Sequence, residues 1–238
     1  MDSNKLLDLL KSGMIVSCQA EGSDPFNEDP SYMALFARAA QMGGAVGIRT
    51  QGIEKLKAIK AAVSLPVIGL TKTLFEDGTV RITGSFKEVE DLLEAGSDMV
   101  AIDGTFRLRE GLSGPDFIKE AKARYSCPVL ADIATLEEAL ACEKAGADAV
   151  STALNGYTPD TVPMASEGPN LDLLRKASGL LGVPVFAEGR YNTPRDAADA
   201  IANGAYAVVT GSAITRPRVV TGWFVERIKE AINNTHNG

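Results

Sequence analysis

Only one histidine is present in the 238 residues, and it is His236, near the C-terminus, where we expect the chain to fray. This excludes Ser-His-Asp triads and metal sites built on histidine, because one terminal side chain supplies neither. Any proton transfer must therefore use lysine, aspartate, glutamate, tyrosine or cysteine.

The sequence is also poor in cysteine and in long apolar runs. Cys18, Cys127 and Cys142 show no metal-type spacing and leave an odd thiol, which is typical of reduced cysteines in a cytoplasm. No apolar run approaches the ~20 residues that a membrane span needs, so no membrane partner is expected. The N-terminal stretch MDSNKLLDLLKSG carries acidic residues and no small-residue cleavage site, and a signal peptide is not expected.

Positive charge is scarce, because the formal net charge is −7. Without a basic patch the chain is not expected to bind nucleic acid, although backbone N–H groups can still bind a small anion. With 45% hydrophobic and 23% charged residues the composition is that of an ordinary globular protein. The length suits one large domain or two small ones.

Two sequence signatures alternate along the chain, and no linker or low-complexity segment separates them. One is a proline followed by an apolar strand with a polar end, at 65–72, 127–135 and 183–190. The other is a glycine-containing turn followed by a strand, at 42–50, 95–105, 145–156 and 203–213. Together with the stretch MIVSCQ at 14–19, they predict eight short strands.

Amphipathic stretches with helical spacing lie between these strands, at 31–42, 52–63, 85–96, 135–146 and 193–204. Thr135 and Thr193 are the predicted N-caps of the last two. Short apolar strands that alternate with helices indicate parallel strands joined by right-handed crossovers. The alternative is an open doubly wound sheet, but no G-x-G-x-x-G opens the first strand–helix unit. We therefore predict that residues 1–238 form a single-domain α/β protein, a (β/α)8 TIM barrel.

Polar side chains end most of the predicted strands, and in this fold the active site lies at those ends. The residues at the strand ends are, in chain order, Gln19, Arg49, Lys72, Asp103, Asp132, Ser151, Thr152, Glu188, Gly211 and Ser212. One polar strand end can simply mark where a strand leaves the core, whereas several in one ring indicate a site. Lys72 is the candidate base, because a neutral amine can remove a proton beside a sugar carbonyl while Asp132, Glu188 or Arg49 steadies the enolate. The alternative is a Schiff base on Lys72, as in aldolases.

The loops after the seventh and eighth strands, FAEGRYNTP and TGSAITRP, predict a phosphate site. Gly189 and the pair Gly211 and Ser212 let backbone N–H groups approach an anion without interference from Cβ, and Arg190 would add charge. The alternative is that the glycines only permit tight turns.

Three further segments lie near the predicted mouth or the C-terminus. Residues 154–170 make a long loop, which contains Tyr157 and has the length of a lid. Residues 21–29 make either a second cover or a solvated segment. Trp223 and Phe224 are expected to serve in packing or in a subunit contact.

A family resemblance rests on eight motifs that occur in order at the strand ends: MIVSCQ, AVGIRTQG, PVIGLTK, AIDGT, ADIAT, LNGYT, AEGRYNTP and GSAITRP. Over essentially the whole chain they resemble the N-acetylmannosamine-6-phosphate 2-epimerases of bacterial sialic-acid breakdown. The resemblance implies a cytoplasmic (β/α)8 barrel that interconverts N-acetylmannosamine 6-phosphate and N-acetylglucosamine 6-phosphate without metal or cofactor.

The resemblance also implies roles for residues at the matching positions. The catalytic lysine and its partner glutamate match Lys72 and Glu188. Substrate contacts match Gln19, Arg49, Asp132 and Arg216, of which only Arg216 is missed by the strand-end analysis. The phosphate loops match Gly189, Arg190, Gly211 and Ser212.

Two departures from the family pattern lie beside the site. The segment FRLREG at 106–111 keeps Arg107 and Arg109 but lacks the usual proline, and STALNGYT replaces a Gly-Thr-Thr start. Both concern loop details and rate rather than the reaction.

The implied reaction needs an opened sugar ring, because C2 is acidic only beside a C1 aldehyde. Lys72 is the candidate for proton transfer at C2, with Asp132, water or a substrate hydroxyl left open as donor on the second face. A non-catalytic sugar-phosphate sensor is a further alternative. A homodimer through Trp223 and the terminal helix is expected.

Overall fold

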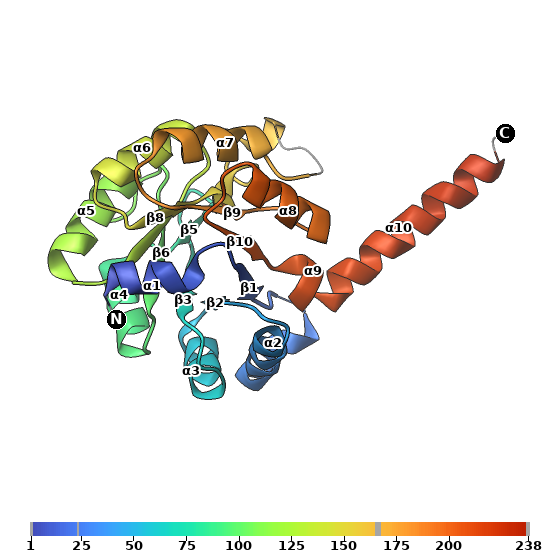
Figure 1. Ribbon diagram of the computed structural model, residues 1–238, viewed down its shortest axis with the longest axis horizontal. Helices are drawn as coiled ribbons and strands as arrows, with labels where there is room; N and C mark the ends of the chain where they lie inside the picture. Colours follow the sequence, from blue (N-terminus) through green and yellow to red (C-terminus); the bar gives the residue numbers. More distant parts are fainter. Residues whose placement is uncertain (1, 23, 165–167, 237–238) are drawn as a thin grey trace.

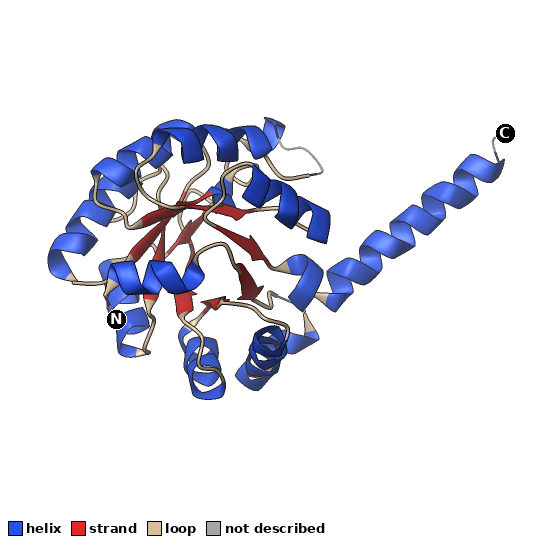
Figure 2. Cartoon of the chain, viewed as in Figure 1, coloured by secondary structure: helices blue, strands red, loops and turns tan. Residues whose placement is uncertain are grey.

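Eight parallel strands close into a barrel in the computed structural model, which describes residues 2–22, 24–164 and 168–236 (Figures 1 and 2). Their order around the barrel is β1-β10-β9-β8-β7-β6-β3-β2. The barrel strands are β1 (Met14–Cys18), β2 (Gly47–Gln51), β3 (Val67–Leu70), β6 (Met99–Asp103), β7 (Val129–Asp132), β8 (Ala149–Ser151), β9 (Val185–Glu188) and β10 (Ala207–Thr210). The predicted (β/α)8 barrel, with all eight strands, is confirmed.

Helices surround the barrel and connect its strands (Figure 2). They are α2 (Pro30–Met42), α3 (Ile53–Ala62), α4 (Phe86–Glu94), α5 (Gly114–Arg124), α6 (Leu136–Lys144), α7 (Leu171–Leu180) and α8 (Pro194–Ala202). Short 3-10 turns are η1 (Pro25–Asn27), η2 (Thr152–Leu154) and η3 (Val162–Met164). Thr135 and Thr193 cap α6 and α8 in capping boxes with Glu138 and Asp196, so both predicted N-caps are confirmed.

The barrel is filled inside and closed at one end. Ile15, Ile68, Leu130 and Phe186 belong to the hydrophobic core inside the barrel, and helix α1 (Ser3–Leu10) adds Leu6, Leu7 and Leu10 to it. The Tyr206 hydroxyl, at the start of β10, donates a hydrogen bond to the Leu7 carbonyl at 3.0 Å. Because α1 covers the N-terminal ends of the strands, the C-terminal ends form the accessible mouth.

Lys72 does not end the third barrel strand, and this part of the sequence prediction was wrong. Strand β3 ends at Leu70, and Lys72 begins β4 (Lys72–Leu74), which pairs antiparallel with β5 (Val80–Ile82). The Thr83 N–H donates to the Thr71 carbonyl at 3.0 Å, so the hairpin begins as soon as the chain leaves the barrel. The run 65–72 looks continuous because no turn residue separates the two strands. Lys72 still lies at the mouth, at the base of the hairpin.

The last helix departs from the barrel. After the short α9 (Ser212–Thr215), α10 (Pro217–His236) projects away from the other elements (Figure 1). Every residue from 221 to 234 is exposed, including Trp223 and Phe224, so neither packs into the core of this chain. The helix runs as far as His236, the last residue that the structure describes. Among the described residues, none of the helices combines the length and apolarity that a membrane crossing requires.

Candidate active site

Three charged side chains meet inside the mouth, and we call them the interior cluster: Arg49 on β2, Asp132 at the end of β7 and Glu188 at the end of β9. Arg49 donates from Nη1 to Asp132 Oδ1 at 2.9 Å and from Nη2 to Asp132 Oδ2 at 2.5 Å. Its Nη1 also lies 3.2 Å from Glu188 Oε2. The side chains of Arg49, Asp132 and Glu188 are 3%, 0% and 15% exposed, so the cluster is shielded from water.

Burial and charge set the protonation of the interior cluster. Burial raises the pKa of Glu188 to about 7, and the charge of Asp132 adds to the rise while Arg49 opposes it. Burial also raises the pKa of Asp132 against the pull of Arg49. Arg49 binds both oxygens of Asp132 but only one of Glu188, and with its raised pKa Glu188 is a carboxyl group that can exchange a proton near neutral pH.

Two neighbours on β8 and η2 orient Glu188. The Ser151 hydroxyl donates to Glu188 Oε2 at 2.9 Å, and the Thr152 hydroxyl donates to the Glu188 carbonyl at 2.7 Å. The strand register brings Ser151 opposite Asp132 on β7. The carboxyl group therefore has a defined direction toward Arg49, and the sequence analysis noted Ser151 and Thr152 without giving them this role.

A second group of charged residues lies further out, and we call it the rim cluster: Glu21, Asp24, Lys72 and Arg216. Lys72 Nζ donates a hydrogen bond to Glu21 Oε1, and Arg216 Nη1 lies 3.4 Å from Glu21 Oε2. The Lys72 and Glu21 side chains are 29% and 41% exposed. The charge of Lys72 is also among the causes that lower the pKa of Asp132 and Glu188, so Lys72 lies within electrostatic reach of the interior cluster.

Two acidic residues of the segment 21–29, Glu21 and Asp24, engage the cations of the rim, while most of its other described residues are exposed. Asp24, which is 4% exposed, accepts from Arg216 Nε at 3.2 Å and from Arg218 Nε at 2.6 Å. The sequence analysis missed both Glu21 and Asp24 as partners of the site. The acidic composition of the segment was visible, but only chain folding reveals which cations it meets.

Gln19 follows β1 and points back into the mouth. Its Nε2 donates to the Ser17 hydroxyl at 2.8 Å. In the strand register Ser17 is the partner of Arg49. Gln19, Arg49, Asp132, Glu188, Lys72 and Arg216 thus all lie around the same barrel mouth, as the sequence predicts for the C-terminal strand ends.

The predicted phosphate residues lie in two neighbouring loops, because β9 and β10 are paired. Gly189 has a φ of 98°, which favours glycine, and a Cβ on Gly211 would come within 3.2 Å of the Ser17 Cβ. Within the described parts of the chain, no hydrogen bond engages the backbone N–H of Gly189, Arg190, Gly211 or Ser212. These N–H groups therefore remain able to bind an anion.

The Arg190 guanidinium is engaged with the long loop rather than held over these N–H groups. Its Nη1 donates to the Asn155 carbonyl at 2.9 Å and its Nε to the Gly168 carbonyl at 2.8 Å, and it lies over the Tyr157 ring. Arg190 has a φ of 62°, an uncommon backbone for a residue with a side chain. These contacts anchor loop 154–170, of which residues 165–167 lie outside the described part.

Asp103 and the two arginines of 106–111 stabilise a loop rather than line the interior cluster. Asp103 Oδ2 accepts from Arg107 Nη2 at 2.7 Å, and Asp103 Oδ1 lies 3.1 Å from Arg109 Nη2. The Arg109 side chain is fully buried. The two ion pairs hold this segment in place without the proline that the family pattern carries.

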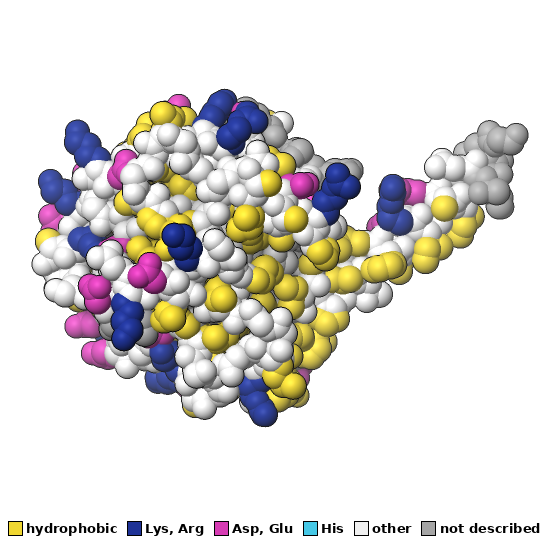
Figure 3. Space-filling model, viewed as in Figure 1, with side chains coloured by type: hydrophobic (Ala, Val, Ile, Leu, Met, Phe, Trp, Pro, Cys, Tyr) yellow, Lys and Arg dark blue, Asp and Glu magenta, His cyan; other side chains and the backbone are white. Residues whose placement is uncertain are grey.

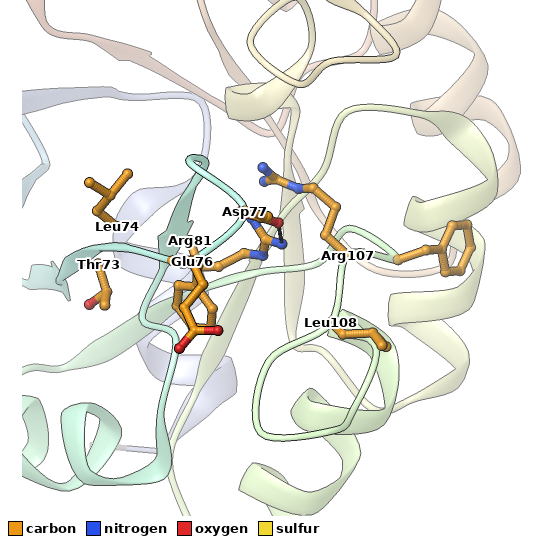
Figure 4. Close-up of a pocket in the computed structure, with 9 residues that line it drawn as sticks. Thr73, Leu74, Glu76, Asp77, Arg81, Arg107 and Leu108 are labelled. Atoms are coloured by element: carbon orange, nitrogen blue, oxygen red, sulfur yellow. Dashed lines mark hydrogen bonds and ion pairs between the residues drawn. The ribbon is translucent and has the colours of Figure 1, made fainter.

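An open cavity of about 780 Å³ lies beside the mouth, between the hairpin and the segment after β6 (Figure 4). Arg81, Asp77, Arg107 and Leu108 are among its lining residues. None of the predicted site residues is among those that line it. The candidate active site is therefore assigned from these converging charges rather than from the cavity.

The cysteines and metal-ligand residues add no chemistry to the mouth. Cys18, Cys127 and Cys142 are free and buried, and burial raises the pKa of all three thiols, that of Cys18 to about 12. A thiol held in this way is a poor nucleophile. In the described residues, no three His, Cys, Asp or Glu side chains come together as a metal site.

A sequence model of the family described as "Putative N-acetylmannosamine-6-phosphate epimerase" matches residues 33–230. A protein of Caldanaerobacter subterraneus subsp. tengcongensis, named putative N-acetylmannosamine-6-phosphate 2-epimerase, is 45% identical over 227 residues and covers 94% of each chain. A protein of Clostridioides difficile with the same name is 43% identical over 225 residues, which is 94% of this chain and 99% of the relative.

Solved structures show the same relationship. The N-acetylmannosamine-6-phosphate 2-epimerase of Clostridium perfringens superposes with a TM-score of 0.87 and 39% identity over 93% of this chain and 95% of its own. The thiamine phosphate pyrophosphorylase of Pyrococcus furiosus superposes with a TM-score of 0.60 at 20% identity over 88% of this chain and 89% of its own. This second likeness concerns the fold alone.

Proposed function

The chain belongs to the N-acetylmannosamine-6-phosphate epimerase family, and we propose that it inverts C2 of N-acetylmannosamine 6-phosphate to give N-acetylglucosamine 6-phosphate. The observation that carries this proposal is the pairing of Asp132 and Glu188 with Arg49 at the barrel mouth, with Lys72 within electrostatic reach of both carboxyl groups. An amine, a carboxyl group that titrates near neutral pH and a fixed cation are the groups that an acid–base epimerisation needs.

Lys72 is the proposed base. In the ring-opened sugar the C1 aldehyde makes the C2 proton acidic. Neutral Lys72 Nζ takes this proton, the C2–H bond breaks, and its electrons form the C1=C2 bond of an enolate with the charge on O1. A proton delivered to the opposite face of C2 restores the aldehyde with inverted configuration. Asp132, water or a hydroxyl of the sugar is the candidate donor for that second face.

Arg49 and Glu188 are proposed to stabilise the intermediate. Two Arg49 N–H groups are held by Asp132, and this pairing fixes the guanidinium beside Glu188. A fixed cation stabilises a developing enolate without having to move. Glu188, with a pKa raised to about 7 by burial, can donate a hydrogen bond to a sugar oxygen or accept one, according to the step.

We propose that the sugar phosphate lies between the loops after β9 and β10. The unengaged N–H groups of Gly189, Arg190, Gly211 and Ser212 support this, since backbone N–H groups bind phosphate well. Arg216 lies beside them on the chain after α9 and would add positive charge. Gln19 would bind a hydroxyl or the N-acetyl group from β1. Loop 154–170, anchored by Arg190, remains a candidate lid.

The test is proton NMR of the purified protein with N-acetylmannosamine 6-phosphate in heavy water, without added metal or nucleotide. We expect N-acetylglucosamine 6-phosphate with deuterium at C2, and no exchange with Lys72→Ala. A substrate that keeps its C2 proton would contradict the epimerase assignment. A borohydride-trapped adduct on Lys72 would instead favour the Schiff-base alternative, and binding without turnover would favour a sensor.

We further propose a homodimer in which the helix α10 of each chain packs on its partner. Phe224, Ile228 and Ile232 follow one another at intervals of four, so they share one face, and they are 69%, 59% and 52% exposed. Figure 3 shows hydrophobic side chains along α10 that continue toward α2. An apolar cavity of about 270 Å³, lined by Phe26, Tyr32, Leu35, Phe36 and Ala39, lies on that side.

A second copy of the chain would remove the apolar face of α10 from water. Contiguous exposed apolar patches of this kind mark protein interfaces. Light scattering should report a dimer for the wild type and a monomer for the double variant Phe224→Ser, Ile228→Ser. Glu226→Ser, on the opposite face of α10, is the matched control and should remain dimeric. A wild type that is monomeric at tens of micromolar would refute the dimer.

We also propose that residues 1–238 are one domain and that the protein works in the cytoplasm. Three free, buried cysteines support a reducing compartment, because disulfides form mainly in oxidising ones. The proposed partner is a phosphorylated amino sugar, and with a net charge of −7 nucleic acid is not a proposed partner.

A further inference from the structure

Glu21 joins two cations that come from different sides of the barrel mouth. One of its oxygens accepts a hydrogen bond from Lys72 on the hairpin after β3, and the other lies 3.4 Å from Arg216 Nη1 after β10. Under the proposed function, Lys72 acts on C2 and Arg216 attracts the phosphate. The Glu21 carboxylate therefore binds both the proposed base, Lys72, and the proposed phosphate ligand, Arg216.

Contacts of neighbouring residues hold the backbone at Glu21 in place. Asp24 anchors the same segment through Arg216 and Arg218, and the Lys55 ammonium donates to the Ala20 carbonyl at 3.3 Å. These contacts hold the backbone on either side of Glu21 against the mouth. Burial tends to raise the pKa of Glu21, but Lys72 and Arg216 outweigh it and keep that pKa below its usual value, so the side chain is anionic at neutral pH.

This arrangement conflicts with catalysis unless the substrate changes it. Lys72 can take a proton from C2 only if its Nζ is available to the substrate, whereas Glu21 already engages that nitrogen in a hydrogen bond. The Glu21 side chain is 41% exposed, so it can leave toward water without unfolding its segment. A phosphate dianion beside Arg216 would both compete for that guanidinium and repel the carboxylate.

We propose that Glu21 is a positioning residue that couples phosphate recognition to the release of Lys72, and that it thereby sets the preference for phosphorylated over neutral amino sugars. With a neutral sugar, the contacts of Glu21 to Lys72 and Arg216 stay intact and the amine stays engaged. With a phosphorylated sugar, the phosphate takes Arg216, Glu21 moves toward water, and Lys72 becomes available to C2. This inference rests on the proposed epimerase function.

The test compares turnover of N-acetylmannosamine 6-phosphate and of unphosphorylated N-acetylmannosamine by the wild type and by Glu21→Gln. We expect kcat/KM for the neutral sugar to rise in the variant and the ratio between the two substrates to fall about five-fold, the upper value of one partly exposed ion pair. Adding phosphite dianion should stimulate the wild type on the neutral sugar more than the variant.

Glu28→Gln is the matched control, since Glu28 lies on the same segment, is exposed and makes no side-chain contact with Lys72 or Arg216. It removes the same charge and should leave the ratio as in the wild type. An unchanged ratio in Glu21→Gln, or an equal fall for both sugars, would overturn the proposal. If Glu21→Gln folds poorly, Glu21→Asp, which keeps the charge but shortens the side chain, should lower the ratio as well.

A binding measurement separates this proposal from the reaction itself. Inorganic phosphate, titrated by calorimetry, should bind Glu21→Gln up to about five-fold more tightly than the wild type, because a competing carboxylate is gone. This result does not depend on turnover. Equal phosphate affinity in both proteins overturns the role of Glu21, whereas absence of C2 exchange in the wild type overturns only the epimerase assignment.

Discussion

The interior and rim clusters lie in the same mouth but differ in their access to water. In the interior cluster, Arg49 and Asp132 are 3% and 0% exposed and bind each other through two hydrogen bonds. In the rim cluster, Lys72 and Glu21 are 29% and 41% exposed. A buried pair costs several kcal/mol if one partner is lost, whereas exposed pairs contribute about 0–1 kcal/mol.

This difference separates two tasks. The interior cluster can hold a cation and two carboxyl groups in one geometry through every step, because nothing from solvent competes for them. At the rim, Lys72 and Glu21 can exchange partners when a substrate arrives, because little free energy holds a partly exposed contact, whereas the buried Asp24 anchors its segment. Removing a residue from the interior should therefore harm the fold and the reaction, while replacing Lys72 or Glu21 should change the reaction and leave the fold intact.

The largest effect is expected from Asp132→Ala. It leaves Arg49 buried without its main partner and should lower the free energy of unfolding by about 3–5 kcal/mol, with turnover lost as well. Urea unfolding followed by circular dichroism measures the first effect. Arg49→Met with Asp132→Leu, which removes both charges, should recover much of the stability but none of the activity. A loss below about 1 kcal/mol would mean that the interior cluster is as exchangeable as the rim.

Lys72→Met should lower turnover with little change in the free energy of unfolding. Without the amine the C2 proton cannot be removed, and kcat should fall about 10³-fold. The free energy of unfolding should change by no more than about 1 kcal/mol, because Lys72 is partly exposed and its partner Glu21 can turn to water. Deuterium incorporation at C2 and urea unfolding are measured on the same preparation. A large loss of stability would place Lys72 with the interior cluster.

Glu188→Gln tests the electrostatics of the interior cluster. The pKa of Glu188 in the folded chain is about 7, against an ordinary value of 4.5. Between these values the folded state binds more protons than the unfolded state, so the free energy of unfolding should fall as pH rises from 4.5 to about 7. In Glu188→Gln this decline should shrink, and Asp132, whose pKa is also raised, should account for what remains.

Unfolding by urea at pH 5 and at pH 7 in both proteins measures this difference. Glu137→Gln, at an exposed carboxylate on α6, is a control that should keep the wild-type slope. A decline that is as steep in Glu188→Gln as in the wild type would show that another group carries the proton.

The smallest effect is expected at an exposed pair outside the mouth. Lys57 and Glu54 on α3 lie 3.0 Å apart with side chains 56% and 71% exposed. Glu54→Gln should change the free energy of unfolding by less than about 0.5 kcal/mol and leave turnover as it is. This variant gives the baseline change in the free energy of unfolding with which variants in both clusters are compared. If Glu54→Gln lowered the free energy of unfolding as much as Asp132→Ala does, burial would not explain the difference between the interior and rim clusters.

Much of the barrel could be predicted from the sequence because its signals are local. Pro66, Pro128 and Pro184 precede short apolar runs with polar ends, and these runs became barrel strands. Thr135 and Thr193 cap their helices as predicted, since a capping box needs only four neighbouring residues. Lys72 was assigned to the wrong strand, because the change from β3 to the hairpin carries no turn residue.

The contacts of the site could be predicted only in part. Strand ends of a barrel converge, so Arg49, Asp132 and Glu188 were expected near one another. That Arg49 takes Asp132 with both nitrogens depends on a pairing across 83 positions of sequence. Glu21 and Lys72 are 51 positions apart and share no motif. The outward course of α10 was equally hidden, because its composition suits packing on its own barrel or on another.

The sequence by itself determined the eight strands, their order of polar ends and the chemistry available at the mouth, since strand length, helix periodicity and caps depend on near neighbours. Only the tertiary structure decided which charges pair, which of them water reaches and where the last helix points. The physical reason is that ion pairing and burial depend on barrel closure and strand register, which bring together side chains that no local pattern connects.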